Sequence, residues 1–274
     1  MGKKEFPKIM GILNVTPDSF SDGGKYFSKE DAVKQGLKLF DDSADILDIG
    51  GESTRPGAKE VSEGDELARV IPVIEQIKIQ RPDAVISIDT TKYNVAKTAV
   101  NAGATIINDI SCLDFDERLA ELAAEKNLTL ILMHIQGTPR TMQENPVYDD
   151  VFQDIFNILK TKIDRAREIG VKSIIADAGI GFGKTYEQNI TLLKNYDKFK
   201  SLGVPLCLGL SRKTFIGKMT GINDPSQRDI PTVLMHALLL NQYIDIIRVH
   251  NVELLNMLKK IYTEFNIQNS ESVD

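Results

Sequence analysis

Eight short apolar segments rich in β-branched residues recur along the chain, and a stretch with helical periodicity follows each of them. The apolar segments are residues 8–15, 44–51, 84–90, 105–110, 129–136, 173–179, 205–211 and 244–251. The helical patterns fall at residues 29–42, 62–79, 92–102, 116–126, 149–168, 186–201, 226–241 and 252–265. Strands that alternate with helices in this way indicate a parallel sheet with crossover helices. Eight such units in 274 residues predict an α/β fold, a single (β/α)8 TIM barrel; a doubly wound open sheet is the alternative.

The chain shows neither a low-complexity linker nor a change in composition, so we expect one domain over residues 1–274. Its core is predicted at about 8–265, followed by an acidic C-terminal tail at 266–274. Two polar segments with Gly or Pro follow the first and second predicted strands, NVTPDSFSDGG (14–24) and ESTRPG (52–57). Segments of this composition are typical of mobile surface loops.

Charge and cysteine usage restrict the class of partner. The net charge is −6, and no block of Lys and Arg exceeds two residues. This argues against nucleic acid or an anionic membrane as the main partner. Cys112 and Cys207 stand in apolar surroundings without metal-ligand spacing, which suits free thiols in a reducing compartment. The N-terminus lacks the apolar run of a signal peptide and no segment reaches membrane length, so we predict a cytoplasmic protein.

Polar side chains stand at the ends of most predicted strands. They are Asn14, Asp89, Asn108, Asp177, Ser211, Lys213, Arg248 and His250. A single one of them could equally be a cap or turn residue. As a set, they are expected to meet at the carboxyl end of the barrel, where enzymes of this fold keep their chemistry.

The residue types in this ring indicate the kind of ligand. Arg248 and His250 lie two residues apart on one strand face and suit an anion, as do Thr54 and Arg55 in the loop whose turn Pro56 would fix. Buried carboxylates at Asp89 and Asp177 need hydrogen-bond donors, which a heterocycle with several N–H groups would supply. A divalent-metal cage built from the same carboxylates and Asn108 is the competing interpretation; a zinc site is not indicated, because paired His and clustered Cys are lacking.

Three further features are weaker signals. DAGIGFGKT (177–185) lacks the full spacing of a Walker A loop, so its glycines are expected to let the backbone approach a flat ligand. His236 is interpreted as a helix-surface or core residue, and the role of His134 is left open.

Eight motifs in order across residues 8–252 resemble the dihydropteroate synthases, pterin-binding TIM-barrel enzymes of folate biosynthesis. They are MGILNVTPDSFSDGG, LDIGGESTRPGA, SIDT, INDI, LMHIQGTP, GFGKT, LGLSRKTFIG and IIRVH. The resemblance implies that 6-hydroxymethyl-7,8-dihydropterin diphosphate condenses with 4-aminobenzoate to give 7,8-dihydropteroate and diphosphate. It implies loss of diphosphate to a pterin cation, which the arylamine then captures. It also implies Mg²⁺, binding of sulfonamide inhibitors and a homodimer.

The resemblance also assigns roles to individual residues. Pterin would be bound by Asp89, Asn108, Met133, Asp177, Phe182 and Lys213, and diphosphate by Thr54, Arg55, Arg248 and His250. The aminobenzoate site would comprise Phe20, Pro56, Phe182, Ser211 and Lys213, with Ser211 opening the helix after the seventh strand. Asn14 would contact Mg²⁺, residues 15–24 would form a lid, and the catalytic residues would be Lys213, Asp22 and Arg55.

Four residues depart from the family's motifs, namely Ala178, Ile180, Pro231 and Asn251. Pro231 puts the helix predicted at 226–241 in doubt, and Ile180 is expected to alter packing behind the pterin. Two other functions are kept as alternatives. A pterin-binding methyltransferase would share the barrel but would not need the Thr54-Arg55 or Ser211-Lys213 segments, and a catalytically silent homologue would act as a binding subunit.

Overall fold

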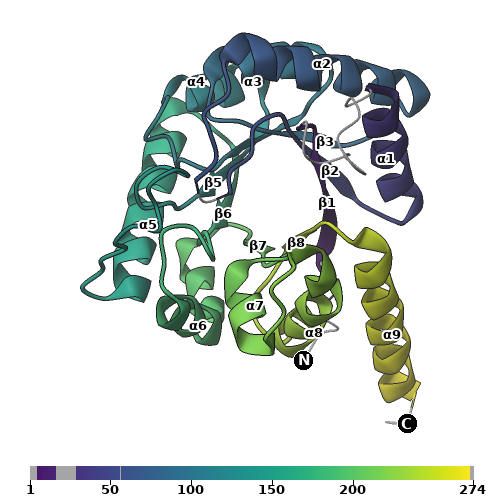
Figure 1. Ribbon diagram of the computed structural model, residues 1–274, viewed down its shortest axis with the longest axis vertical. Helices are drawn as coiled ribbons and strands as arrows, with labels where there is room; N and C mark the ends of the chain where they lie inside the picture. The colour runs from purple at the N-terminus through teal and green to yellow at the C-terminus, as the bar shows by residue number, and fades with distance from the viewer. Residues whose placement is uncertain (1–4, 17–28, 56, 272–274) are drawn as a thin grey trace.

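The computed structural model describes residues 5–16, 29–55 and 57–271, with side chains as far as residue 266. Within this part of the chain, eight parallel strands form one sheet in the order β6-β5-β4-β3-β2-β1-β8-β7. The strands are β1 (Lys8–Asn14), β2 (Ile46–Gly50), β3 (Ile86–Asp89), β4 (Ile106–Asp109), β5 (Thr129–Met133), β6 (Ser173–Asp177), β7 (Cys207–Gly209) and β8 (Ile246–Val249). A parallel bridge between Ala176 and Leu206 joins the two ends of this sheet. The strands therefore form the predicted TIM barrel, ringed by helices (Figure 1).

The helices of the described residues cover the outside of this barrel (Figure 1). They are α1 (Lys29–Asp41), α2 (Glu63–Gln80), α3 (Tyr93–Asn101), α4 (Arg118–Lys126), α5 (Val151–Ile169), α6 (Tyr186–Lys194), α7 (Thr214–Thr220), α8 (Asp229–Leu239) and α9 (Val252–Glu271). Two 3₁₀ segments, Tyr196–Leu202 and Pro225–Arg228, lie before β7 and α8. No described helix is both long enough and apolar enough to cross a membrane.

The seventh βα unit differs from its sequence prediction. A short helix, α7, follows β7, whereas the helical periodicity of the sequence places the first helix of this unit at residues 226–241. That predicted segment divides into a 3₁₀ turn and α8, which begins at Asp229. Pro231 therefore lies in the first turn of α8, where the missing N–H costs no intrahelical bond. At the other end of the chain, α9 continues to Glu271 and so includes most of the tail predicted at 266–274.

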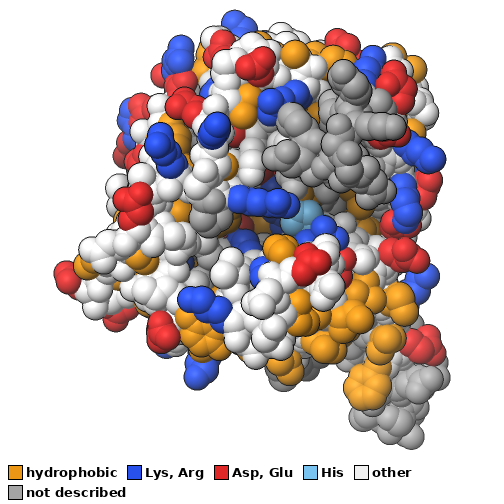
Figure 2. All heavy atoms as spheres, viewed as in Figure 1, with side chains coloured by type: hydrophobic (Ala, Val, Ile, Leu, Met, Phe, Trp, Pro, Cys, Tyr) orange, Lys and Arg blue, Asp and Glu red, His pale blue; other side chains and the backbone are white. Residues whose placement is uncertain are grey.

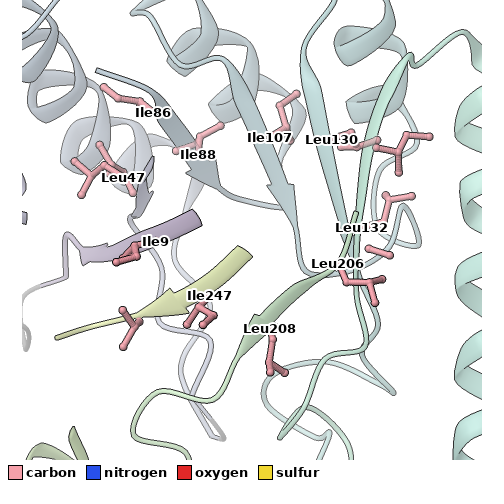
Figure 3. Packing of buried hydrophobic residues seen from close by; sticks show 14 of the residues in the cluster. Ile9, Leu47, Ile86, Ile88, Ile107, Leu130, Leu132, Leu206, Leu208 and Ile247 are labelled. Carbon is pink, nitrogen blue, oxygen red and sulfur yellow. The ribbon is translucent and has the colours of Figure 1, made fainter. Parts of the chain in front are cut away.

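Strand alternation divides the core into two layers. On the outside of the sheet, residues such as Ile9, Leu47, Ile88 and Leu208 pack under the helices (Figure 3). The inside of the barrel is filled by a second cluster comprising Met10, Ile46, Ile106, Ile131, Ile175, Cys207 and Ile246. Side chains two positions further along a strand point to the same side. The residues after this apolar floor are Asp48, Asn108, Asp177 and Arg248, so the fold places a polar layer above the floor, toward the carboxyl ends of the strands.

Candidate active site

The Arg248 guanidinium connects three strands inside the barrel. Its Nε donates to Oδ2 of Asp48 on β2 at 2.6 Å, and one Nη donates to Oδ2 of Asp89 on β3 at 2.7 Å. The Nδ2 of Asn108 on β4 donates to the same Asp48 oxygen at 3.1 Å. Asp48 has no exposed surface and Asn108 is 5% exposed, so these bonds form in a largely water-free interior. The structure thus brings Asp89, Asn108 and Arg248 together, as the sequence predicts, but around a carboxylate that the prediction left out.

Asp48 carries a signal that sequence analysis could have used. It is the only charged residue of β2 (ILDIG) and lies between apolar residues that are themselves fully or nearly fully buried. A charge at the centre of a buried strand needs a partner. Because that partner comes from β8, two hundred residues later, the motif alone does not reveal it.

Asp177 and Lys213 face the same interior from the opposite side of the barrel. Oδ1 of Asp177 accepts a hydrogen bond from the backbone N–H of Gly179 at 2.7 Å. The Lys213 ammonium donates to the carbonyl of Ile180 and lies 4.6 Å from the centroid of the Phe182 ring. Burial raises the pKa of Asp177, and the charge of Lys213 opposes this rise. Burial also lowers the pKa of Lys213 to about 8, against the attraction of Asp177.

Burial raises the pKa of two carboxyl groups in this layer, Asp89 and Asp177. Burial raises the pKa of Asp89 to about 7, although the Arg248 charge acts in the opposite direction. Perturbed groups of this kind gather at functional sites, where they donate or accept protons and hydrogen bonds near neutral pH. The carboxyl groups of Asp89 and Asp177 can accept hydrogen bonds, whereas the Lys213 side chain donates them. Together with the amide of Asn108, they suit a flat ligand that carries both N–H donors and carbonyl acceptors.

The positive charges of Arg248 and Lys213 disfavour the alternative of a metal site at the carboxylates of Asp89 and Asp177. Asp89 is bonded to Arg248, and Asp177 lies close enough to Lys213 to change its pKa. In the described segments, no three His, Cys, Asp or Glu side chains are grouped so that they could hold a metal ion.

A second polar group lies where β1 and β8 end. Nδ1 of His250 lies 2.8 Å from Oγ of Ser211, and Nε2 of His250 lies 3.5 Å from Nδ2 of Asn14. Burial lowers the pKa of His250 to about 3, helped by nearby guanidinium charges. The ring is therefore neutral, and a ring that accepts from Asn14 at Nε2 carries its proton on Nδ1 and donates to Ser211.

The position of Ser211 corrects one prediction. Helix α7 begins at Thr214 with Lys213 as its N-cap residue, so Ser211 does not open that helix. Ser211 lies in the preceding turn, and its side chain is occupied by the backbone N–H and the ring of His250. The reason is local: Arg212 takes a positive φ of 61° and its guanidinium binds Asp229, so the chain turns once more before the helix starts.

The loop after β2 lies beside this group. Thr54 is half-buried and Arg55 is exposed, and the Arg55 charge contributes to the lowered pKa of His250. The base of the loop is tied together because Glu52 accepts from the Val61 N–H at 3.0 Å and from Lys92 at 2.5 Å. A cavity of about 390 Å³ adjoins the loop; its lining includes Thr54, Asp89, Lys92, Phe115 and Arg140. Figure 2 shows the hollow on this face, with Lys or Arg and His side chains at its centre.

The remaining predicted site residues fall into two sets. Met133 is buried at the end of β5, and Phe182 is half-buried beneath the Lys213 ammonium. Phe20, Asp22 and Pro56 lie outside the described residues, as does most of the predicted lid. His236 belongs to the core, where burial lowers its pKa to about 4. His134, whose role the sequence left open, is buried, and its Nδ1 lies 3.1 Å from Nζ of Lys184.

The departures from the family's motifs leave the polar layer intact. Ala178 and Ile180 are both buried, and the Ile180 carbonyl accepts from Lys213. Asn251 accepts from the Leu254 N–H in the first turn of α9 and donates to Asp229. An Asn in this place therefore keeps the capping function that an Asp would have.

Comparison with known proteins agrees with this geometry. The model of the family described as "Pterin binding enzyme" matches residues 10–250. The dihydropteroate synthase of Synechocystis is 45% identical over 262 residues, which cover 95% of this chain and 90% of that protein.

Solved structures give the same result. A structure of Xanthomonas albilineans dihydropteroate synthase with 4-aminobenzoic acid superposes with a TM-score of 0.88 at 40% identity, covering 98% of this chain and 94% of that one. A Yersinia pestis dihydropteroate synthase with a sulfonamide drug has a TM-score of 0.86 at 40% identity, covering 95% and 94%. The chain described here belongs to the dihydropteroate synthase family of pterin-binding enzymes.

Proposed function

We propose that this chain condenses 6-hydroxymethyl-7,8-dihydropterin diphosphate with 4-aminobenzoate, giving 7,8-dihydropteroate and diphosphate in folate biosynthesis. The observation that carries the proposal is the buried layer in which Arg248 binds Asp48 and Asp89 while Lys213 faces Asp177. This layer offers acceptors and donors on opposite sides of one interior, which matches the edges of a pterin ring. Membership of the dihydropteroate synthase family supports the reaction.

The pterin is assigned to the interior of the barrel. Asp177 accepts from N2 and N3 of the ring, Asn108 pairs with N1 and N2, and Asp89 accepts from N8–H. Lys213 donates to O4 and N5, and Met133 and Phe182 provide apolar contact. The support is that these side chains come from strands or strand ends around one buried interior.

The diphosphate is assigned to the rim formed by Thr54, Arg55, Arg248 and His250. Arg248 also bonds Asp48 and Asp89, so its charge lies between the pterin site and the rim. A neutral His250 adds no charge, and its ring bonds orient Ser211 and Asn14 beside the diphosphate position. The positive charge at the rim therefore comes from the two arginines, which bind phosphate oxygens through their planar guanidinium groups.

Mg²⁺ is the metal that we assign to this rim. With Nδ2 of Asn14 turned toward His250, the amide oxygen is the side-chain atom left for a metal. One protein oxygen fits Mg²⁺, which is commonly bound by few protein groups together with substrate phosphates. When bound, Mg²⁺ supplies positive charge to the departing diphosphate.

The reaction that these residues support begins with cleavage of the C–O bond between the pterin methylene and diphosphate. Both electrons of this bond leave with the diphosphate oxygen, and Arg55, Arg248 and Thr54 stabilise the charge that develops there. The amine nitrogen of 4-aminobenzoate then bonds to the methylene cation and loses a proton. Burial of the pterin site excludes water, which would otherwise capture the cation.

The aminobenzoate is assigned to Phe182, Lys213 and Ser211 in the outer part of the site. Phe20 and Pro56, which the resemblance adds to this set, and Asp22, which it makes catalytic, lie outside the described residues. Structures of relatives with 4-aminobenzoic acid and with a sulfonamide drug support binding of an aminobenzoate by this chain, and we expect it to bind sulfonamides as well.

A homodimer is proposed from the surface of α8 and α9, which pack against each other. Ile230, Leu234 and Leu238 on α8 are 64%, 61% and 77% exposed. Met257, Ile261 and Phe265 on α9 are 54%, 65% and 69% exposed. Figure 2 shows hydrophobic side chains gathered at the lower right, where these helices lie in Figure 1. Apolar patches of this kind mark protein interfaces.

A cytoplasmic location is proposed as well, since Cys112 and Cys207 are buried free thiols.

The experiment that tests the function is direct detection of 7,8-dihydropteroate from the purified chain, the pterin diphosphate, 4-aminobenzoate and Mg²⁺. Product is expected only when both substrates are present, and diphosphate is expected in equal amount. Binding of the pterin without any turnover would instead identify a catalytically silent homologue.

A further inference from the structure

The β6–α6 loop, residues 178–185, forms one wall of the polar layer. Gly179, Gly181 and Gly183 all have positive φ, of 63°, 85° and 62°. A Cβ on Gly179 would lie 1.8 Å from the carbonyl oxygen of His134, so the loop backbone lies directly against the end of β5. Such a fold of the loop requires specific bonds to hold it, because glycines add no side-chain packing of their own.

Lys184 supplies bonds within this loop. Its side chain is buried, at 3% exposure, and its Nζ lies 2.8 Å from the Gly179 carbonyl and 2.8 Å from the Phe182 carbonyl. The third contact is Nδ1 of His134 at 3.1 Å. Three acceptors thus surround one amine, and burial together with the Lys213 charge lowers the pKa of Lys184 well below its usual 10.5. His134 stays neutral as this arrangement requires, because burial and the Lys184 charge lower its pKa to about 2.

The two carbonyls that Lys184 binds bracket the part of the loop that faces the pterin site. Between them, the Ile180 carbonyl accepts from Lys213. At one end, the Gly179 N–H donates to Asp177, and at the other the Phe182 ring lies under the Lys213 ammonium. The place of both pterin-facing charged groups therefore depends on the shape of the segment that Lys184 closes.

Other bonds of the loop act at different residues. Asn189 accepts from the Gly181 N–H at 2.6 Å, Gln143 donates to the Gly181 carbonyl at 2.9 Å, and Tyr148 donates to the Gly183 carbonyl at 2.7 Å. These contacts attach the loop to its neighbours. The Lys184 bonds instead tie Gly179 to Phe182 and both to His134, so they set the internal shape of the segment.

We propose that Lys184 is a positioning residue for the pterin site, which through its bonds to Gly179, Phe182 and His134 holds Lys213 and Asp177 where they bind the ring. The proposal rests on the proposed function, because it assumes that the ligand of this interior is a pterin. A Lys that only stabilised the fold would not change pterin affinity in the folded protein, and this difference can be measured.

The test compares Lys184→Met with Lys194→Met, a matched removal of an exposed ammonium at the end of α6. Calorimetry with 6-hydroxymethyl-7,8-dihydropterin is expected to show at least tenfold weaker binding for Lys184→Met and a change within threefold for Lys194→Met. Diphosphate with Mg²⁺ serves as a second probe, and its dissociation constant for Lys184→Met should lie within threefold of that for the unmodified protein. Where Lys184→Met does not fold, Lys184→Gln, which keeps two N–H donors, carries the same comparison with a smaller expected loss.

A double-variant cycle with Lys213→Met separates positioning from an independent effect. If Lys184 acts through Lys213 and Asp177, part of its effect is already lost in Lys213→Met, so Lys184→Met should weaken pterin binding less in that background than in the unmodified protein. Losses that multiply, or a Lys184→Met protein that binds the pterin normally, would overturn the proposal. Failure of the unmodified protein to bind the pterin would contradict the proposed function instead, so the two failures are distinguishable.

Discussion

The Nε of Arg248 lies 2.6 Å from Oδ2 of Asp48, which has no exposed surface, at the centre of the barrel. This pair joins β8 to β2, and Asn108 adds a third strand through the same oxygen. Removal of one partner of a buried ion pair leaves the other charge uncompensated, which commonly costs about 3–5 kcal/mol. The pair is therefore expected to hold the polar layer together before any ligand binds.

The first prediction is that Asp48→Ala lowers the free energy of unfolding by about 3 kcal/mol or more, because Arg248 and Asn108 both lose an acceptor. Urea unfolding measures the change. Asp41→Ala is the matched control, since Asp41 pairs with Arg81 at 3.3 Å on the surface and its side chain is 76% exposed. That control is expected to cost at most about 1 kcal/mol. An equal decrease in the free energy of unfolding in the two variants would show that the buried pair contributes no more to stability than the exposed one.

The second prediction concerns the pH dependence of pterin binding. Burial depresses the pKa of Lys213 from 10.5 to about 8, so the ammonium loses its proton near pH 8 and not near pH 10.5. Pterin affinity is expected to fall as the pH rises through this value, because the charged donor disappears. The unfolded chain binds this proton more tightly, so the contribution of Lys213 to stability rises with pH between about 8 and 10.5.

Binding titrations at several pH values test this assignment. Lys213→Met should bind the pterin more weakly at neutral pH and should lack the decline near pH 8. Lys218→Met, which removes an exposed ammonium from helix α7 that Lys213 precedes, should keep that decline. A decline that persists in Lys213→Met would assign the titration to another group.

The third prediction is that Asp177→Asn weakens pterin binding at least about tenfold while the protein stays folded. The amide presents N–H groups where the carboxylate accepts, and a buried unpaired donor costs about 1–3 kcal/mol. Calorimetry measures the affinity, and circular dichroism checks the fold. Asp197→Asn, at an exposed position after α6, is the control and should bind normally. Unchanged affinity in Asp177→Asn would remove this residue from the pterin site.

The parts of the site that sequence could predict are those that depend on strand ends. Asn108 and Asp177 each end an apolar run, and alternation along a strand is enough to place them inside a barrel. The partners of Arg248 could not be predicted in the same way, because they come from strands that are distant in the chain. The role of Lys184 was equally out of reach, since its bonds depend on the shape of a loop with positive φ at three glycines.

Periodicity does not reveal the helix after β7, for a different reason. Helix α7 has only seven residues, TFIGKMT, with two Thr and a Gly that have low helix propensity. Its formation depends on tertiary packing: Phe215 and Ile216 are both buried. Periodicity over one to two turns is too short to distinguish such a helix from a loop.

The last prediction concerns the apolar surface of α8 and α9. Leu234→Glu with Leu238→Glu places two carboxylates on residues that are 61% and 77% exposed, so the isolated fold should tolerate the change. If this surface joins two copies, burying these charges between them is unfavourable, and sedimentation should show a shift from dimer to monomer. Ile79→Glu is the control, because Ile79 is 69% exposed on α2 and its change should leave the dimer intact. A double variant that stays dimeric, with its thermal unfolding unchanged, would show that the copies associate through a different face. An unmodified protein that sediments as a monomer would remove the dimer itself.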